Sequence, residues 1–150
     1  MATGRSNTAL GLSPSGEATA SGAKFLLDEN IVIYREVIVD SASTDSLRLP
    51  TTTLEPGLVL IKQGTGRWKS LADASIVSTD NACILHNNNE PVNVLDSLGT
   101  AQHRYGIKVV VHGLVIPANV HDSAGVAIST NGKAALTDSK NGCNVMFAAS

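Results

Sequence analysis

The residues with the most evident capacity for chemistry are four histidines, His86, His103, His112 and His121. The last three are nine residues apart, whereas histidines that bind zinc together usually lie a few residues apart on one element. The chain has no His-Glu-x-x-His, His-x-His or Cys-x-x-Cys arrangement, which are the spacings that bring such ligands together. We therefore expect no metal site and no cofactor.

Two cysteines, Cys83 and Cys143, are sixty residues apart, and no secretory signal precedes them. We expect both to be buried, reduced thiols of a protein made in a cytoplasm, because free cysteine packs as a small apolar residue there. A mixed or intermolecular disulfide is the alternative. Asp122 and Asp138 flank polar loops, and we predict that they are solvated charges or caps of helix ends.

The common catalytic motifs are absent: the sequence has no Gly-x-Ser-x-Gly elbow, no Walker loop and no Gly-x-Gly-x-x-Gly after a strand. Its 11 Lys and Arg residues nearly balance 13 Asp and Glu, giving a net charge of −2 without a basic run, so nothing supports an electrostatic grip on nucleic acid. The apolar runs fall short of the roughly 20 residues that a membrane helix needs. We predict a soluble, non-enzymatic protein with neither nucleic acid nor membrane as a direct partner.

The first 24 residues are mostly Ala, Gly, Ser and Thr, and they lack the apolar density that would offset the entropy of ordering them. We interpret residues 1–24 as a flexible N-terminal arm and residues 25–150 as one β-rich domain. Leu10 and Leu12 are the obvious anchors if the arm docks onto a partner. A plain solubilising tail is the alternative.

From Phe25 onward, short β-rich runs alternate with turn residues, as in an all-β domain. In residues 31–40 the two-residue period places Ile31, Ile33, Val37 and Val39 on one face. A hairpin is predicted around the Gly64-Thr65-Gly66 turn, because glycine adopts the positive φ angles of tight turns. On its return strand Trp68 is expected to be a core or interface plug.

Further along, residues 82–86 and 91–95 flank a polar Asn-Asn-Asn-Glu stretch, which favours a second hairpin. Residues 106–117 are apolar on both alternating faces and are predicted to form the central strand, covered on both sides. Gly113 within this strand indicates a bulge or a close approach of another backbone.

The only helical signal covers residues 132–142, which hold Ala-Ala-Leu and end at Asn-Gly. A closing strand over residues 143–147 is expected to carry Phe147 into the core. The predicted fold is therefore all-β with one short C-terminal helix, in a compact barrel-like or sandwich-like domain that follows an extended arm.

Several ordered blocks resemble the head decoration proteins of phages that are related to the phage lambda head protein D. The blocks are FLLDEN (25–30), YREVIVDSAS (34–43), LEPGLVLIKQGTGRWKSL (54–71), NACILHNNNEPVNV (81–94), KVVVHGLVIPANV (108–120) and KAALTDSKNGCNVMF (133–147). Each block is a hydrophobic pattern with its turns rather than a catalytic fingerprint. The Arg and Asp often found before the opening strand of the family are represented here only by Arg35 and Glu36.

The resemblance implies a structural virion protein that binds the outer surface of an expanded phage capsid and stabilises it. Its partner would be the major capsid protein, and it would act as a trimer at local three-fold positions, with a dimer as the alternative. It would lie on the capsid exterior after assembly in the host cytoplasm.

Two other classes remain. One is a different virion β-module, of the tail, the baseplate or a glycan-binding type, although glycan readers usually expose aromatic residues and this chain has only five. The other is a trimeric all-β nucleotide hydrolase of the dUTPase type, which needs an acidic strand motif, whereas residues 106–117 contain no acid.

The candidate capsid-binding residues are the apolar side chains of the arm and of the segment that joins it to the domain. We expect this segment to form an edge that faces the capsid or a neighbouring copy, because its apolar side chains would otherwise be exposed. The alternative is that they pack into the core of the monomer. These candidates are Leu10, Leu12, Phe25, Leu26, Leu27, Ile31 and Ile33.

Overall fold

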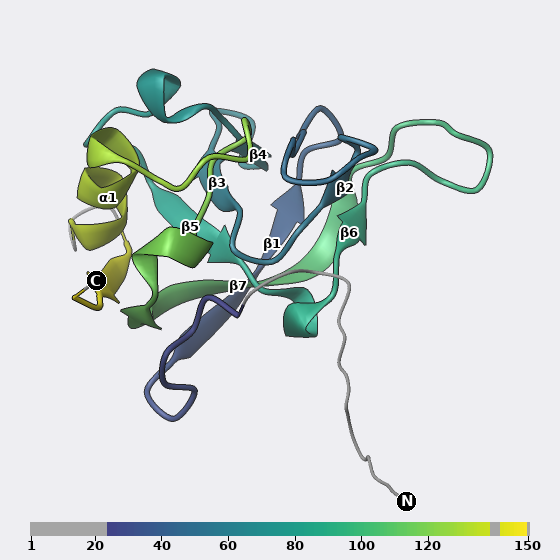
Figure 1. Ribbon diagram of the computed structural model, residues 1–150. Helices are drawn as coiled ribbons and strands as arrows, with labels where there is room; N and C mark the ends of the chain where they lie inside the picture. Colours follow the sequence, from purple (N-terminus) through teal and green to yellow (C-terminus); the bar gives the residue numbers. More distant parts are fainter. Residues whose placement is uncertain (1–23, 139–141, 150) are drawn as a thin grey trace, which may run out of the picture.

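The computed structural model describes residues 24–138 and 142–149 (Figure 1). As expected, these residues form a mainly β fold with one α-helix. The strands are β1 (Ile33–Val39), β2 (Thr53–Leu54), β3 (Val59–Lys62), β4 (Trp68–Ser70), β5 (Ala82–Leu85), β6 (Val92–Asn93), β7 (Arg104–Val115) and β8 (Asn144–Phe147). The helix is α1 (Thr130–Thr137), and short 3₁₀ turns cover Asp73–Ser75, Asn87–Asn89 and Pro117–Asn119.

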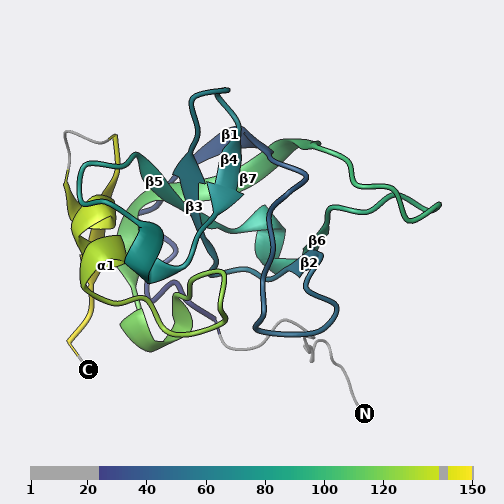
Figure 2. The same ribbon diagram turned by 90° about the horizontal axis from the view of Figure 1, so that it is seen from above.

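Five strands form a small barrel (Figures 1 and 2). They follow the order β1-β4-β3-β5-β7, and β1 also pairs with β7, which closes the ring. β8 extends the sheet by pairing in parallel with the last four residues of β7. The predicted central strand is confirmed, since β7 pairs with β1, β5 and β8. Its cover on both sides is limited to the middle of the strand, where Val109, Val110 and Val111 are buried in succession.

The barrel wall is apolar on both faces, which produces two cores. In β3, Leu60 packs into a cluster inside the barrel, while its neighbours Val59 and Ile61 pack into a second cluster outside the wall. The inner core holds Val37, Val39, Leu54, Leu58, Leu60, Trp68, Cys83, Leu85, Val92, Val94, Val109 and Val111. The burial of Trp68 confirms that it belongs to the core.

The outer core is covered by α1, β8 and the segment before β1. Phe25 and Leu26 are 1% and 2% exposed and belong to this core. The prediction that they form an exposed edge is therefore wrong. The physical reason is that Leu26 bridges Val115 and shares its buried face. Phe25, whose carbonyl accepts the Ile116 N–H, packs against the ring of His86.

The hairpin around Gly64-Thr65-Gly66 is confirmed, because β3 and β4 pair in antiparallel register and Gly66 has a φ of +84°. The second predicted hairpin is wrong. β5 pairs with β3 and β7, whereas β6 pairs with β2, so the two segments diverge after the Asn87–Asn89 turn. All three asparagines adopt positive φ angles, which bend the chain away from its own strand rather than back along it.

The helix begins at Thr130, two residues earlier than predicted, and ends at Thr137, followed by Asp138 as the C-cap. Asp73, distant in sequence, accepts the N–H groups of Ser129 and Gly132 at 3.2 and 2.8 Å, and this long-range cap explains the earlier start. β8 confirms the closing strand, and its last residue, Phe147, is half-buried against the outer core.

Gly113 is buried where a Cβ would lie 3.5 Å from side-chain atoms of Leu26 and Val32, so side chains rather than another backbone approach it. The expected bulge does occur just before it, since the β1–β7 register shifts between Ile33 and Tyr34. Among the described residues no helix has the length and apolarity to cross a membrane.

Candidate functional site

Three neighbouring strand segments place apolar side chains on one exposed face at the end of β7. Leu27 donates its N–H to the carbonyl of Leu114 at 3.0 Å, and Leu114 in turn lies opposite Met146 of β8. Leu26 and Val115 point together into the outer core, so the two-residue period turns Leu27 and Leu114 to the opposite face.

His112 and its two neighbours across the sheet lie next to Leu27, Leu114 and Met146. His112 is opposite Ile33 of β1 on one side and Asn144 of β8 on the other. His112 and Leu114 are two residues apart on β7 and therefore share a face. We use the term apolar face for Leu27, Ile33, Leu114 and Met146, which surround the half-buried His112.

The exposed fractions make this surface a candidate site for docking. Leu27 is 53% exposed, Ile33 56% and Met146 43%, and Ile31, in the loop between Leu27 and Ile33, is 49% exposed. Large apolar side chains gathered on one face of a protein often mark an interaction site.

The structure places the seven predicted capsid-binding residues in different environments. Leu27, Ile31 and Ile33 are at the surface, Phe25 and Leu26 are in the core, and Leu10 and Leu12 lie outside the described residues. Sequence reasoning missed Leu114 and Met146. The signal for Met146 was present, because Val145 and Met146 alternate between buried and exposed along β8.

A buried histidine fastens the segment that precedes the apolar face. His86 is 5% exposed, and its ring packs against Phe25 and Tyr34 with centroids 6.0 and 4.9 Å apart. Its Nδ1 accepts the Asn88 N–H at 3.1 Å, so the proton of the neutral ring lies on Nε2, which has no hydrogen-bond partner among the described residues. Burial and the nearby charge of Lys108 lower the pKa of His86.

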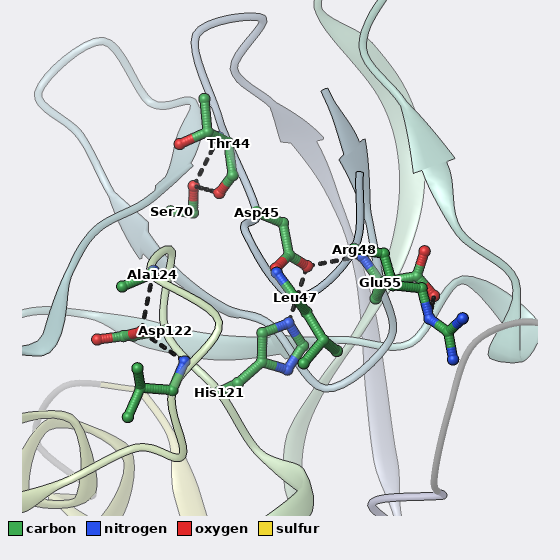
Figure 3. Close-up of polar contacts among 10 residues, drawn as sticks. Thr44, Asp45, Leu47, Arg48, Glu55, Ser70, His121, Asp122 and Ala124 are labelled. Atoms are coloured by element: carbon green, nitrogen blue, oxygen red, sulfur yellow. Dashed lines mark hydrogen bonds and ion pairs between the residues drawn. The ribbon is translucent and has the colours of Figure 1, made fainter. Parts of the chain in front are cut away.

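A second polar cluster is buried between three loops (Figure 3). Asp45 is fully buried; its Oδ1 accepts the Leu47 N–H at 2.9 Å, and its Oδ2 accepts the Glu55 N–H at 2.9 Å. The Nε2 of His121 lies 2.8 Å from the same Oδ2 and, beside a carboxylate, it acts as the donor.

Glu55 adds a second carboxylate to this buried cluster. It is 3% exposed, its Oε1 has no hydrogen-bond partner within residues 24–138 and 142–149, and the Nε of Arg48 lies 3.8 Å away. Burial raises the pKa of Glu55, with Asp45 adding to the effect and Arg48 opposing it. Close packing beside the cluster needs Gly57, whose φ is +99° and where a Cβ would lie 2.5 Å from the Asn119 carbonyl oxygen.

Asp122 completes the polar interior next to His121. It is 6% exposed, and its carboxylate accepts the N–H groups of Asp73, Ala124 and Val126. The alternative of a solvated charge is therefore wrong. Asp122 instead fixes the loop after β7, because three backbone donors converge on it; Figure 3 shows the bond from Ala124.

The carboxylate–histidine pair has the atoms of a base and its orienting acid, yet its bonds hold loops together. In the described residues no hydrogen bond joins His121 to a hydroxyl or thiol. Across the same residues, no three His, Cys, Asp or Glu side chains gather as metal ligands. We therefore treat this cluster as structural and the apolar face as the candidate functional site.

Comparisons with protein-family models, curated proteins and solved structures find no match to this chain.

Proposed function

We propose that this chain is a structural, non-enzymatic virion protein that binds the outer surface of an expanded phage capsid and stabilises it. The apolar face is the surface that docks onto the major capsid protein, and its first residue, Leu27, follows the N-terminal arm closely in the sequence. The observation that supports the proposal most strongly is the exposure of Leu27, Ile33 and Met146 on one sheet face, on the two sides of His112 and Leu114 of β7.

The sequence blocks that resemble phage head decoration proteins supply the identity of the partner. The arm adds a second contact, through Leu10 and Leu12, because an extended segment can add to an exposed sheet edge through its backbone. Assembly as a trimer at local three-fold positions would combine three such contacts, and linked contacts can raise avidity by roughly 10²–10⁴.

The test is cosedimentation of the full chain with expanded and unexpanded shells. The double variant Ile33→Ser, Met146→Ser should bind expanded shells about thirtyfold more weakly, since each half-exposed side chain contributes about 1 kcal/mol when it is covered. The matched control is Leu98→Ser, because Leu98 is 88% exposed on the loop that projects from the side opposite α1 (Figures 1 and 2).

Equal binding to both kinds of shell, or equal loss in the control and the double variant, would contradict the proposal. Removal of the arm, residues 1–24, should weaken shell binding and leave the melting temperature nearly unchanged. Light scattering, together with the position of the bound protein on the shell, distinguishes a trimer at a three-fold position from a dimer at a two-fold position. Clear saccharide hits on a glycan array would favour the glycan-binding module instead.

A further inference from the structure

The barrel is incompletely closed along one side of β1. On its β7 side, β1 pairs from Ile33 to Val39, but on its other side it meets β4 only where Val39 lies opposite Trp68. No strand in the described part of the chain lies beside the preceding residues of β1 on that side. An open strand edge of this kind can accept another extended segment.

The register shows which backbone groups face this opening. The carbonyl of Lys108 accepts the N–H of His86, so the backbone N–H and C=O of Lys108 point toward β5. The backbone groups of its neighbours on β7, Ile107 and Val109, therefore point toward β1, where these residues lie opposite Val37 and Arg35. The backbone groups of Glu36, between those two residues, must then point away from β7 and into the opening.

A depression of about 390 Å³ lies at this edge. We call it the edge groove; it is lined by Arg35, Glu36, Val37, Ile38, Lys62, Gly66, Trp68 and Gly106. Gly66 and Gly106 have positive φ angles, and a Cβ at either would meet no atom within 4 Å. These glycines leave open space where a second backbone could pass.

The edge groove has an apolar floor, formed by Val37 and Trp68, and a cationic residue next to each of them. Val37 and Trp68 belong to the inner core. Lys62 lies directly opposite Trp68, and Arg35 is two residues before Val37, so both cations share the inner face with this apolar floor. Glu36 lies on the other face of β1 for the same reason.

Neither of these two cations takes part in an ion pair with another described residue. A ligand that pairs with the β1 backbone would place alternate side chains over Val37 and Trp68, between Arg35 and Lys62. Apolar and acidic side chains suit that position, and basic ones do not.

We propose that the edge groove binds an extended segment of a partner protein that pairs with the free edge of β1 and directs an acidic residue, flanked by apolar ones, between Arg35 and Lys62. This surface is separate from the apolar face, and the proposal does not depend on the proposed function.

The probe is a synthetic peptide, acetyl-Thr-Val-Thr-Glu-Thr-Val-Thr-amide, titrated into the full chain. Its alternation places the two valines and the glutamate on one face. Trp68 is the only tryptophan of the chain and lies in the groove, so its fluorescence should report binding directly. A peptide with Lys in place of Glu should bind about tenfold more weakly, because two favourable charge pairs become repulsive.

Two variants test the two parts of the proposal. Glu36→Pro removes an N–H that faces the groove, and proline is tolerated on a strand edge, so peptide binding should be lost while the melting temperature changes little. The double variant Arg35→Ala, Lys62→Ala should bind the Glu and Lys peptides equally. A peptide N-methylated at alternate residues tests backbone pairing even if Glu36→Pro does not fold.

The proposal is overturned if the Glu peptide leaves the Trp68 fluorescence unchanged, if the Glu and Lys peptides bind the unaltered chain equally, or if the N-methylated peptide binds as well as the parent.

Discussion

Asp45 is predicted to be the most sensitive polar residue of the domain. It accepts two buried donors at one oxygen, the Glu55 N–H and the His121 ring N–H, and the half-buried Leu47 N–H at the other. Asp45→Ala leaves these donors without an acceptor. At about 1–3 kcal/mol for each buried donor, the loss should be about 3–5 kcal/mol of unfolding free energy, a large part of the roughly 5–15 kcal/mol that stabilises a typical domain.

The conservative variant separates the two oxygens. Asp45→Asn can keep its carbonyl toward Glu55 and His121 and turn its amide toward the Leu47 N–H, so only the half-buried bond is lost. We expect a loss of about 1 kcal/mol for Asn, measured by urea unfolding and followed by both circular dichroism and Trp68 fluorescence.

Asp96→Ala is the matched control, because Asp96 also accepts two backbone N–H groups, from Leu98 and Thr100, but in an exposed loop. Its removal should change the urea midpoint far less than Asp45→Ala. The reasoning is refuted if Asp45→Ala is no worse than Asp96→Ala, or if Asp45→Asn is as damaging as Asp45→Ala.

Three further predictions follow from burial. Burial and Lys108 lower the pKa of His86 in the folded state, so at mildly acidic pH the unfolded chain binds one more proton than the folded chain. The contribution of His86 to stability should therefore be complete above a pH of about 6.5 and be lost as the pH falls through the folded-state pKa. His86→Gln should flatten the pH dependence of the unfolding free energy measured with urea, and an unchanged pH dependence would contradict the assignment. Cys83 and Cys143 are buried and free, and burial raises the pKa of both thiols, that of Cys143 to about 12; Ellman's reagent should therefore react with them only after unfolding, and rapid reaction of the native protein would be the contrary result. Phe25→Ala should cost about 3–5 kcal/mol of unfolding free energy, whereas Leu27→Ala should cost less than about 0.5 kcal/mol; similar melting temperatures for the two variants would show that Phe25 is not part of the core.

The alternation of apolar residues was sufficient to predict most of the strands. Apolar residues on both faces located β7 as the central strand, because such a strand has few places other than the middle of a fold. The glycine turn located the β3–β4 hairpin. The burial of Cys83 and Cys143 was expected because free cysteine packs as a small apolar residue, and Trp68 was expected to be a core or interface plug. These properties depend on local composition and on the two-residue period, which can be read in a segment without knowledge of the rest of the chain.

Only the tertiary structure decided which apolar side chains are covered. Phe25 and Leu27 are equally apolar in sequence, yet Phe25 packs against the ring of His86 in the outer core, whereas Leu27 stays 53% exposed. The early start of α1 depends on Asp73, more than fifty residues away, and the buried Asp45–His121 pair spans 76 residues. The apolar face and the edge groove are likewise assembled from strands that are distant in the chain. A sequence period defines the two faces of a strand, whereas long-range packing determines which face, and which part of it, remains open to a partner.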